Sequence, residues 1–261
     1  MHKNLKPFLE GLYYVYARRE LINPDPLYFL YNYEKVRDRE IIGLIASSLA
    51  YGRVAQIMKS VERVLKFLTS EPYNFLSSNE KFEVIPENFK HRFTTSYDIN
   101  NLLRNISEVL REYKSLENFL NYCLISAHNE IFSTLDKFSE RLSRNQKQGA
   151  FSLVTAPKDG SACKRLFLFL KWLVRRDDVD PGGWKVLRPR NLIIPTDTHM
   201  HNIGRKLGFT NRKSGDLKTA IEITNSFREI CPDDPAKYDF VLTRFGIRAG
   251  LNVGELSGLL L

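Results

Sequence analysis

The apolar residues of this chain recur mostly at intervals of three and four, which is the spacing of one face of an α-helix. Alternation of Val, Ile and Thr, which is typical of strands, is scarce. The fold is therefore predicted to be nearly all α. The helical segments are 5–21, 38–52, 53–68, 98–110, 116–128, 131–142, 162–176, 198–207, 217–230 and 235–245.

Three stretches lack a clear helical pattern. Residues 70–89 are rich in Asn, Ser, Glu and Pro and predict a loop with at most one short element. Residues 143–149 are a polar linker. Residues 246–261 form a glycine-spaced apolar tail that is expected to pack against the body of the protein.

The segment 162–176 is apolar around most of its circumference and is predicted to lie inside the molecule. Its cations Lys164, Lys171 and Arg175 are seven and four residues apart. They fall within roughly 40° of one another on a helix. Such a stripe predicts that the helix lines a cleft, and the alternative is that the three side chains reach solvent at the rim of the helix.

Lys164 follows Gly160 and Ser161 at the start of this helix. A tight turn that leads into a helix N-terminus presents free N–H groups to a phosphate. Burial and a second cation, Lys171, favour the uncharged form of an amine, which can attack a carbon and form a Schiff base. The alternative is a helix-start lysine with no chemical role.

Asp197 lies in the sequence Pro-Thr-Asp-Thr before an amphipathic segment, which predicts an N-cap. A carboxylate at that position is held ionised and oriented, so it can also stabilise positive charge that develops on a sugar. His199 and His201 give a third hypothesis, a metal hydrolase with a His-x-His site. On a helix, however, they point about 200° apart, which disfavours a shared metal.

Composition narrows the choice of partner. The chain has 261 residues, enough for one large or two smaller domains, and a net charge of +9. That charge predicts a polyanionic partner, with nucleic acid first and an anionic membrane surface second, and a solvated lysine surface is the alternative. The three scattered cysteines indicate reduced thiols in a cytosol. The N-terminus has no apolar signal segment, and no apolar run is long enough to span a bilayer.

These residues resemble the helix-hairpin-helix DNA glycosylases, the superfamily that includes endonuclease III. In that group a glycine hairpin precedes a helix with a catalytic lysine, matched by Lys164, and a later helix start supplies the aspartate, matched by Asp197. The separation of 33 residues (197 − 164), together with Lys171 and Asp239, is similar to the archaeal 8-oxoguanine branch. The chain also looks like a widespread bacterial family known as a domain of unknown function.

The resemblance implies two helical lobes with a helix-hairpin-helix element and a cleft between them. Residues 36–190 would form the lobe that carries Lys164, and residues 1–35 with 191–261 the lobe that carries Asp197. Lys164 and Asp197 would be catalytic. The remaining site residues would be Tyr51, Lys171 and Asp239 in a base pocket, and Gly160, Ser161, Arg53 and Arg165 on DNA.

The activity implied is that of a base-excision-repair DNA glycosylase with AP-lyase activity, both a hydrolase and a lyase. Its substrate would be an oxidised purine, preferably 8-oxoguanine, in damaged double-stranded DNA. A cytoplasmic, nucleoid-associated monomer is expected, with no membrane partner and no cofactor. Four cysteines do not follow Asp239, so the iron–sulfur cluster of endonuclease III is not expected.

The chain departs from the family pattern at three positions. Gly160-Ser161 replaces a Gly-x-Gly hairpin, Thr243 replaces an aromatic that stacks on the base, and Tyr51 replaces a DNA-probing glutamine. These departures leave a second hypothesis open. In that hypothesis the chain is a non-catalytic helix-hairpin-helix protein that binds nucleic acid.

Overall fold

The computed structural model describes residues 5–78, 84–146 and 152–247, and it confirms an all-α fold. The chain divides into two compact units, one of residues 23–158 and one of residues 1–22 with 159–261. Strands within the described residues are limited to β1 (Lys90–His91) and β2 (Thr94–Thr95), which pair antiparallel. The expected tail begins at residue 246 and lies almost wholly outside the described residues.

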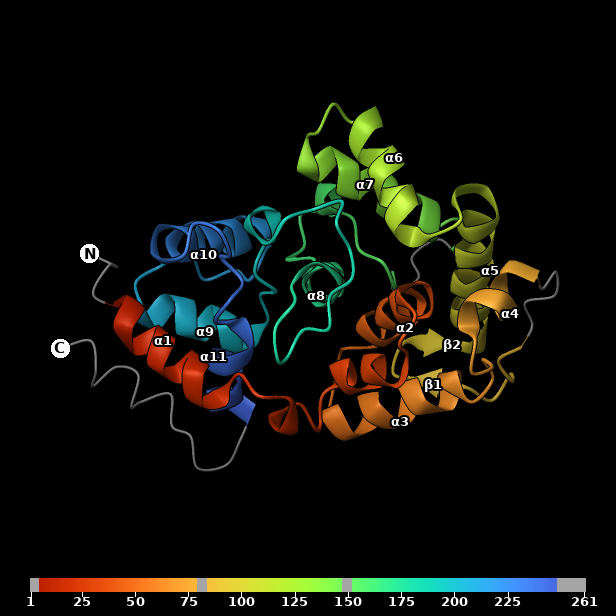
Figure 1. The fold of residues 1–261 in the computed structure, drawn as a ribbon, viewed down its shortest axis with the longest axis horizontal. Coiled ribbons are helices and arrows are strands. Elements are labelled where there is room, and N and C mark those ends of the chain that lie inside the picture. The colour runs from red at the N-terminus through yellow and green to blue at the C-terminus, as the bar shows by residue number, and fades with distance from the viewer. Residues whose placement is uncertain (1–4, 79–83, 147–151, 248–261) are drawn as a thin grey trace. The chain divides into compact units, whose positions relative to one another are not determined.

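The unit of residues 23–158 is built around α2 (Val36–Ser48), which is labelled in Figure 1. The apolar side chains of α2 are buried on nearly every side. The acidic residue Glu40 is buried as well, because its carboxylate accepts hydrogen bonds from the N–H groups of Leu116 and Glu117 at the start of α6. The other elements are η3 (Pro26–Asn32), α3 (Val54–Leu65), α4 (Pro72–Ser78), α5 (Ser96–Tyr113), α6 (Leu116–Ser126) and α7 (Ile131–Leu142).

Most predicted helices are present, and their ends differ for local reasons. The short element expected in 70–89 is α4. The helix predicted to start at Asp98 starts at Ser96, because Thr95 is the N-cap and Asp98 completes a capping box from the third position. The first predicted helix stops at Tyr16, and a 3-10 turn, η2 (Arg19–Leu21), follows it.

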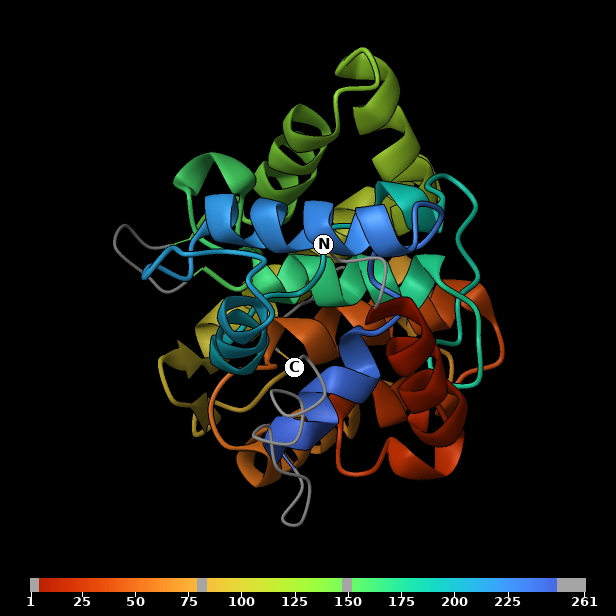
Figure 2. The ribbon, with the colours of Figure 1, turned by 90° about the vertical axis from the view of Figure 1, so that its left-hand side faces the viewer.

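The second unit contains α1 (Leu5–Tyr16), α8 (Lys164–Val174), η5 (Pro189–Asn191), α9 (Thr198–Lys206), α10 (Leu217–Ile230) and α11 (Asp239–Ile247). Helix α9 packs against α10 and α11, and α1 packs against α11. Helix α8 is seen from the side in Figure 2. It buries nearly all its side chains, as its apolar sequence predicts. The helix predicted at 235–245 begins only at Asp239.

The unit boundaries differ from the expected lobes 36–190 and 1–35 with 191–261, because α8 belongs with the chain's terminal elements. The N–H group of Leu217 donates to the Gly160 carbonyl, and Ser161 forms an isolated antiparallel bridge with Asp216. The turn that precedes α8 is therefore tied to the start of α10. Lys164 and Asp197 consequently lie in one unit.

Of the expected helix-hairpin-helix element, the structure shows a glycine turn followed by a helix, without a helix directly ahead of the turn. Gly160 has a φ of +74°, in the left-handed region that favours glycine, and α8 follows it. The segment directly ahead of Gly160 is only the 3-10 turn η4 (Pro157–Asp159). Among the helices of the described residues, none combines the length and the apolarity that a bilayer crossing requires.

Candidate active site

Lys164 and Asp197 meet in the structure. The Nζ atom of Lys164 lies 3.1 Å from Oδ2 of Asp197. The two side chains keep 33% and 24% of their surface exposed, so a solute can reach both. The first residue of α8 and the residue that caps α9 thus form an amine–carboxylate pair that is half-buried and open to solvent.

The two oxygens of Asp197 have separate partners. Oδ1 accepts hydrogen bonds from the N–H groups of His199 at 2.9 Å and Met200 at 3.0 Å, as expected of an N-cap. Oδ2 faces Lys164. The backbone bonds therefore fix the orientation of the carboxylate that contacts the amine.

Asp197 is held in its ionised form. Burial by itself raises the pKa of Asp197, but the Lys164 charge and the Met200 N–H group outweigh burial, so the pKa is lowered below its ordinary value. The positive end of α9 acts in the same direction. Asp197 is thus a carboxylate at neutral pH, suited to accept a proton or to stabilise a nearby cation.

Of the three cations on the predicted stripe, only Lys164 reaches solvent. Lys171 is 1% exposed, and its Nζ lies 3.2 Å from Oδ1 of Asp180 and 3.2 Å from Oδ2 of Asp239. Burial lowers the pKa of Lys171, but Asp180 and Asp239 more than offset it and the pKa is raised. The Lys171 charge is therefore balanced by two carboxylates.

Arg175, the third cation, is 3% exposed and contacts Asp177, Asp180 and Asp234. The stripe of cations was predicted either to line a cleft or to reach solvent at the rim of the helix. Both predictions are wrong for Lys171 and Arg175, because these side chains are buried. They form a buried ion network that joins α8 to the loop after it and to α11.

Asp239 connects this network to the surface pair. Burial raises the pKa of Asp239 to about 6, with Asp197 and Asp180 acting in the same direction and Lys171 opposing them. Asp239 is the first residue of α11, and it lies close enough to Asp197 for their charges to interact. The predicted base-pocket residues Lys171 and Asp239 therefore pair with each other, and both are buried in this structure.

Tyr51 and Arg53 lie in the unit of residues 23–158. The Tyr51 hydroxyl donates to the carbonyl of His91 at 2.8 Å and shares a 2.7 Å hydrogen bond with the Thr94 hydroxyl. Tyr51 thus holds the β1–β2 hairpin, a role that the expectation of a base pocket did not include. Arg53 is exposed at the N-cap of α3.

The residues around α8 that were expected to contact DNA differ in their exposure to solvent. Gly160 and Ser161 are exposed in the turn before the helix. Arg165 is only 8% exposed, because α8 is buried from its first turn, so Arg165 is not a surface cation as expected. Sequence reasoning missed Asp180, fully buried between Lys171 and Arg175, although its Asp-Pro-Gly-Gly context marked a turn.

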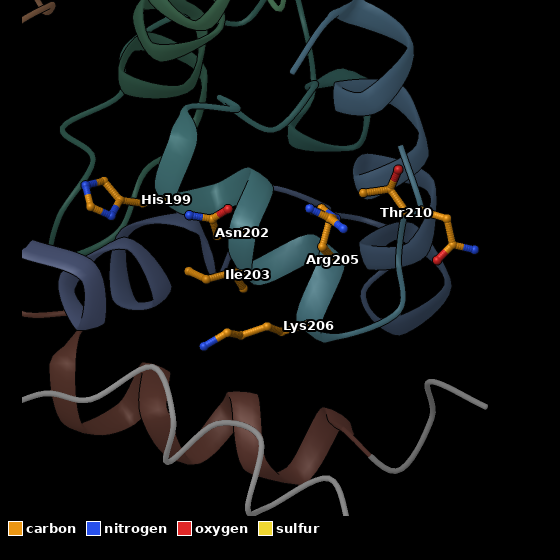
Figure 3. Close-up of a pocket in the computed structure, with 7 residues that line it drawn as sticks. His199, Asn202, Ile203, Arg205, Lys206 and Thr210 are labelled. Atoms are coloured by element: carbon orange, nitrogen blue, oxygen red, sulfur yellow. The ribbon is translucent and has the colours of Figure 1, made fainter. Parts of the chain in front are cut away.

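A hollow of about 440 Å³ lies along α9 (Figure 3). His199 is exposed and lines it. The Nε2 atom of His201 lies 3.0 Å from the carbonyl of Arg212, so the two histidines have different surroundings. Among the described residues, no group of three or more His, Cys, Asp or Glu side chains is arranged to hold a metal ion.

The fold and the site together define the class of protein. It is an all-α protein in which a lysine, the first residue of a buried helix, contacts the aspartate that caps a second helix. The family model described as protein of unknown function (DUF2400) matches residues 25–248. The chain belongs to this family. No curated protein and no solved structure matches it.

Proposed function

We propose that this protein is a base-excision-repair DNA glycosylase with AP-lyase activity. The observation that supports this most directly is the Lys164–Asp197 pair, in which an amine and an oriented carboxylate stand 3.1 Å apart with both side chains partly exposed. A nucleophilic amine beside a carboxylate that can take its proton is the arrangement that Schiff-base chemistry on a sugar requires.

In the proposed reaction, Asp197 accepts a proton from Lys164, and the uncharged amine attacks C1′ of the damaged nucleotide. The C1′–N bond breaks, and the base leaves with the electron pair and takes up a proton. Asp197 passes the proton it accepted to the departing base, and the carboxylate restored in this way stabilises the positive charge that develops on the sugar. The nitrogen loses a second proton, the C1′–O4′ bond opens, and O4′ is protonated, which leaves an iminium. Removal of a C2′ proton then expels the 3′ phosphate by β-elimination.

Damaged double-stranded DNA is the proposed partner, because the net charge of +9 favours a polyanion. Gly160, Ser161 and Arg53 are the exposed members of the predicted DNA-binding set. The preference for 8-oxoguanine, the monomeric state and the location in the nucleoid follow from the resemblance. For Lys171 and Asp239 to contact the base, their buried pair has to open when the base enters.

Borohydride trapping tests the activity. A duplex with an abasic site or 8-oxoguanine is incubated with the protein and borohydride, which reduces a Schiff base to a stable covalent adduct. We expect an adduct with the wild-type protein and with Lys218→Gln, which removes an exposed lysine from α10. We expect none with Lys164→Gln. An adduct that persists in Lys164→Gln would contradict the assigned nucleophile.

The second candidate is a non-catalytic protein that binds nucleic acid. The observation in its favour is the burial of both Lys171 and Asp239 in one ion pair, which leaves no open base pocket at those residues. This candidate predicts tight DNA binding and no covalent adduct on any lesion. A panel of lesion-bearing duplexes, each tested for trapping and for binding, separates the two candidates.

A further inference from the structure

The hollow along α9 is lined by basic side chains, neutral polar side chains and one isoleucine, and no acidic residue is among them. Its lining residues are His199, Asn202, Ile203, Arg205, Lys206, Thr210 and Asn211. His199, Asn202, Ile203 and Lys206 follow the spacing i, i+3, i+4 and i+7, which places them on one face of α9. Figure 3 shows His199, Ile203 and Lys206 extending from the same side of the helix.

The basic side chains of this hollow are available to a ligand. His199, Arg205 and Lys206 are exposed, and the side chains of Arg205 and Lys206 form no ion pair or hydrogen bond with the described residues. The nearby Arg212 differs, because it is paired with Asp216. The Thr210 hydroxyl is already engaged, since it donates to Glu222 at 2.6 Å and accepts from the Arg212 N–H group. Positive charge thus gathers at Arg205 and Lys206 without a carboxylate to balance it, and the exposed His199 ring adds hydrogen-bonding capacity to the same hollow.

We infer that this hollow binds the phosphodiester backbone of the strand whose sugar enters at Lys164 and Asp197. The identity of the strand rests on the proposed function. The two sites share one rigid element, because Asp197 is the N-cap of α9 and Arg205 and Lys206 are in its last turn. At about 1.5 Å per residue, Arg205 lies roughly 12 Å along the helix axis from Asp197. That distance corresponds to between three and four nucleotides at about 3.4 Å each.

A backbone contact at this distance gives α9 a positioning role. A phosphate held by Arg205 and Lys206 places the sugar a few nucleotides away against the capping carboxylate of the same helix. Because a helix is rigid along its length, the bound phosphate fixes the register of the DNA strand relative to Asp197. Phosphate contacts of this kind fix register and orientation without reading sequence.

The lining favours a nucleic-acid strand over a lipid surface. The one apolar residue of the hollow is Ile203, which is 1% exposed. A helix that lies in a membrane interface needs exposed apolar side chains beside its cations. The basic and polar side chains from His199 to Lys206 also extend over roughly 10 Å of helix, which is long for one phosphate group and suits successive groups on a strand.

The test compares DNA binding by the wild-type protein, the double variant Arg205→Gln/Lys206→Gln and the control Lys66→Gln, which removes an exposed lysine that is paired with Glu62. Fluorescence anisotropy is measured on a duplex with a stable abasic analogue and on an undamaged duplex, over a series of salt concentrations. We expect the double variant to bind both duplexes roughly tenfold more weakly, with a salt slope smaller in magnitude by about 1 to 2. Lys66→Gln should bind like the wild type, because the Lys66 charge is already paired with Glu62.

A charge-swapped variant, Arg205→Lys/Lys206→Arg, keeps both cations and should keep most of the affinity and the salt slope. Thermal unfolding checks that each variant is folded, which is expected because both side chains are exposed. Unchanged affinity and slope in the double variant would overturn the α9 site, even if Lys164 forms an adduct. Weakened binding in the double variant without any adduct on the lesion panel would support the α9 site and overturn the glycosylase. Binding to anionic vesicles in place of DNA would overturn both.

Discussion

At the scale of single residues, the most informative feature is that the two carboxylate oxygens of Asp197 have different partners. One oxygen caps α9 through the N–H groups of His199 and Met200, and the other faces Lys164 at 3.1 Å. The interpretation of Asp197 as an N-cap and its interpretation as a partner of the amine are therefore both confirmed in geometry. Substitutions that separate the two roles test the chemistry of the pair.

Asp197→Asn and Asp197→Ala provide that separation. Asparagine keeps an oxygen that caps the helix but loses the charge, so the free energy of unfolding should fall by less than about 1 kcal/mol. Alanine loses the cap too and should cost about 1 kcal/mol more. Single-turnover cleavage of a lesion duplex should fall by roughly 10² to 10⁴ in both. Wild-type rates in Asp197→Asn would reduce Asp197 to a cap.

The main effect of replacing Lys171 is expected to be a loss of stability. Lys171→Gln leaves Asp180 and Asp239 buried without their cation, which should lower the free energy of unfolding by about 3 to 5 kcal/mol, measured by urea denaturation. Arg175 still contacts Asp180, so the loss should be greatest at Asp239. An unchanged midpoint together with lost activity would instead assign Lys171 to substrate recognition alone.

The same variant has a predicted pH dependence. The pKa of Asp239 is raised to about 6, above its ordinary value of 3.8, so the folded protein holds this proton more tightly than the unfolded chain. The contribution of Asp239 to stability is therefore full below pH 4 and is lost as the pH rises through about 6. Removing the Lys171 charge raises that pKa further. The deficit of Lys171→Gln should consequently be largest above pH 6 and shrink in acid, and a deficit that grows in acid would contradict this origin.

At the scale of elements, the position of α9 decides where the candidate site lies. Gly204 allows α9 to approach α10 closely, because a Cβ atom there would lie 2.6 Å from Cδ1 of Ile223. The capping residues determine where each helix begins and ends. The contact between α9 and α10 determines where α9 lies in the unit. A change at Gly204 therefore alters the site through the helix that carries Asp197, without touching the pair itself.

Gly204→Ala should lower the free energy of unfolding by about 1 to 3 kcal/mol through overpacking, measured by thermal or urea unfolding. Gly11→Ala is the matched control. Gly11 lies exposed in α1, and a Cβ atom there meets nothing within 4 Å. Removing a helical glycine at an open position should stabilise the protein by roughly 0.5 to 1 kcal/mol. Equal effects at both positions would show that α9 and α10 do not depend on this close approach.

At the scale of the whole molecule, the net charge of +9 is the property that most directly concerns a partner. Buried cations such as Lys171 and Arg175 are paired with carboxylates and contribute little field outside the protein. Exposed cations without a carboxylate partner, such as Arg205 and Lys206, carry the interaction with phosphates. DNA affinity should thus depend on a subset of the basic residues.

Binding to an undamaged duplex should accordingly weaken steeply with salt. The logarithm of the association constant is expected to fall linearly with the logarithm of the salt concentration, with a slope of about −0.9 for each phosphate contacted. Titrations by anisotropy between roughly 50 and 200 mM salt measure this slope. An affinity that stays constant over that range would exclude the phosphate backbone as the main partner.

Much of this protein was determined by its sequence alone. Helical periodicity located α7 and α10 to the residue, the Pro-Thr-Asp-Thr pattern predicted the cap at Asp197, and the apolar circumference of 162–176 predicted the burial of α8. These features depend on interactions between residues close in the chain, or on the overall balance of apolar and polar side chains. Both kinds of information can be read without coordinates.

Only the tertiary structure decided which charges meet. A lysine at a helix start has the same local sequence whether its amine faces solvent or a carboxylate 33 positions later (197 − 164). The pairing of Lys171 with Asp180 and Asp239, the burial of Arg165 and the assignment of α8 to the terminal unit all depend on long-range packing. Contact across the chain depends on how whole helices pack, so periodicity, which reports the face of a single helix, cannot supply it.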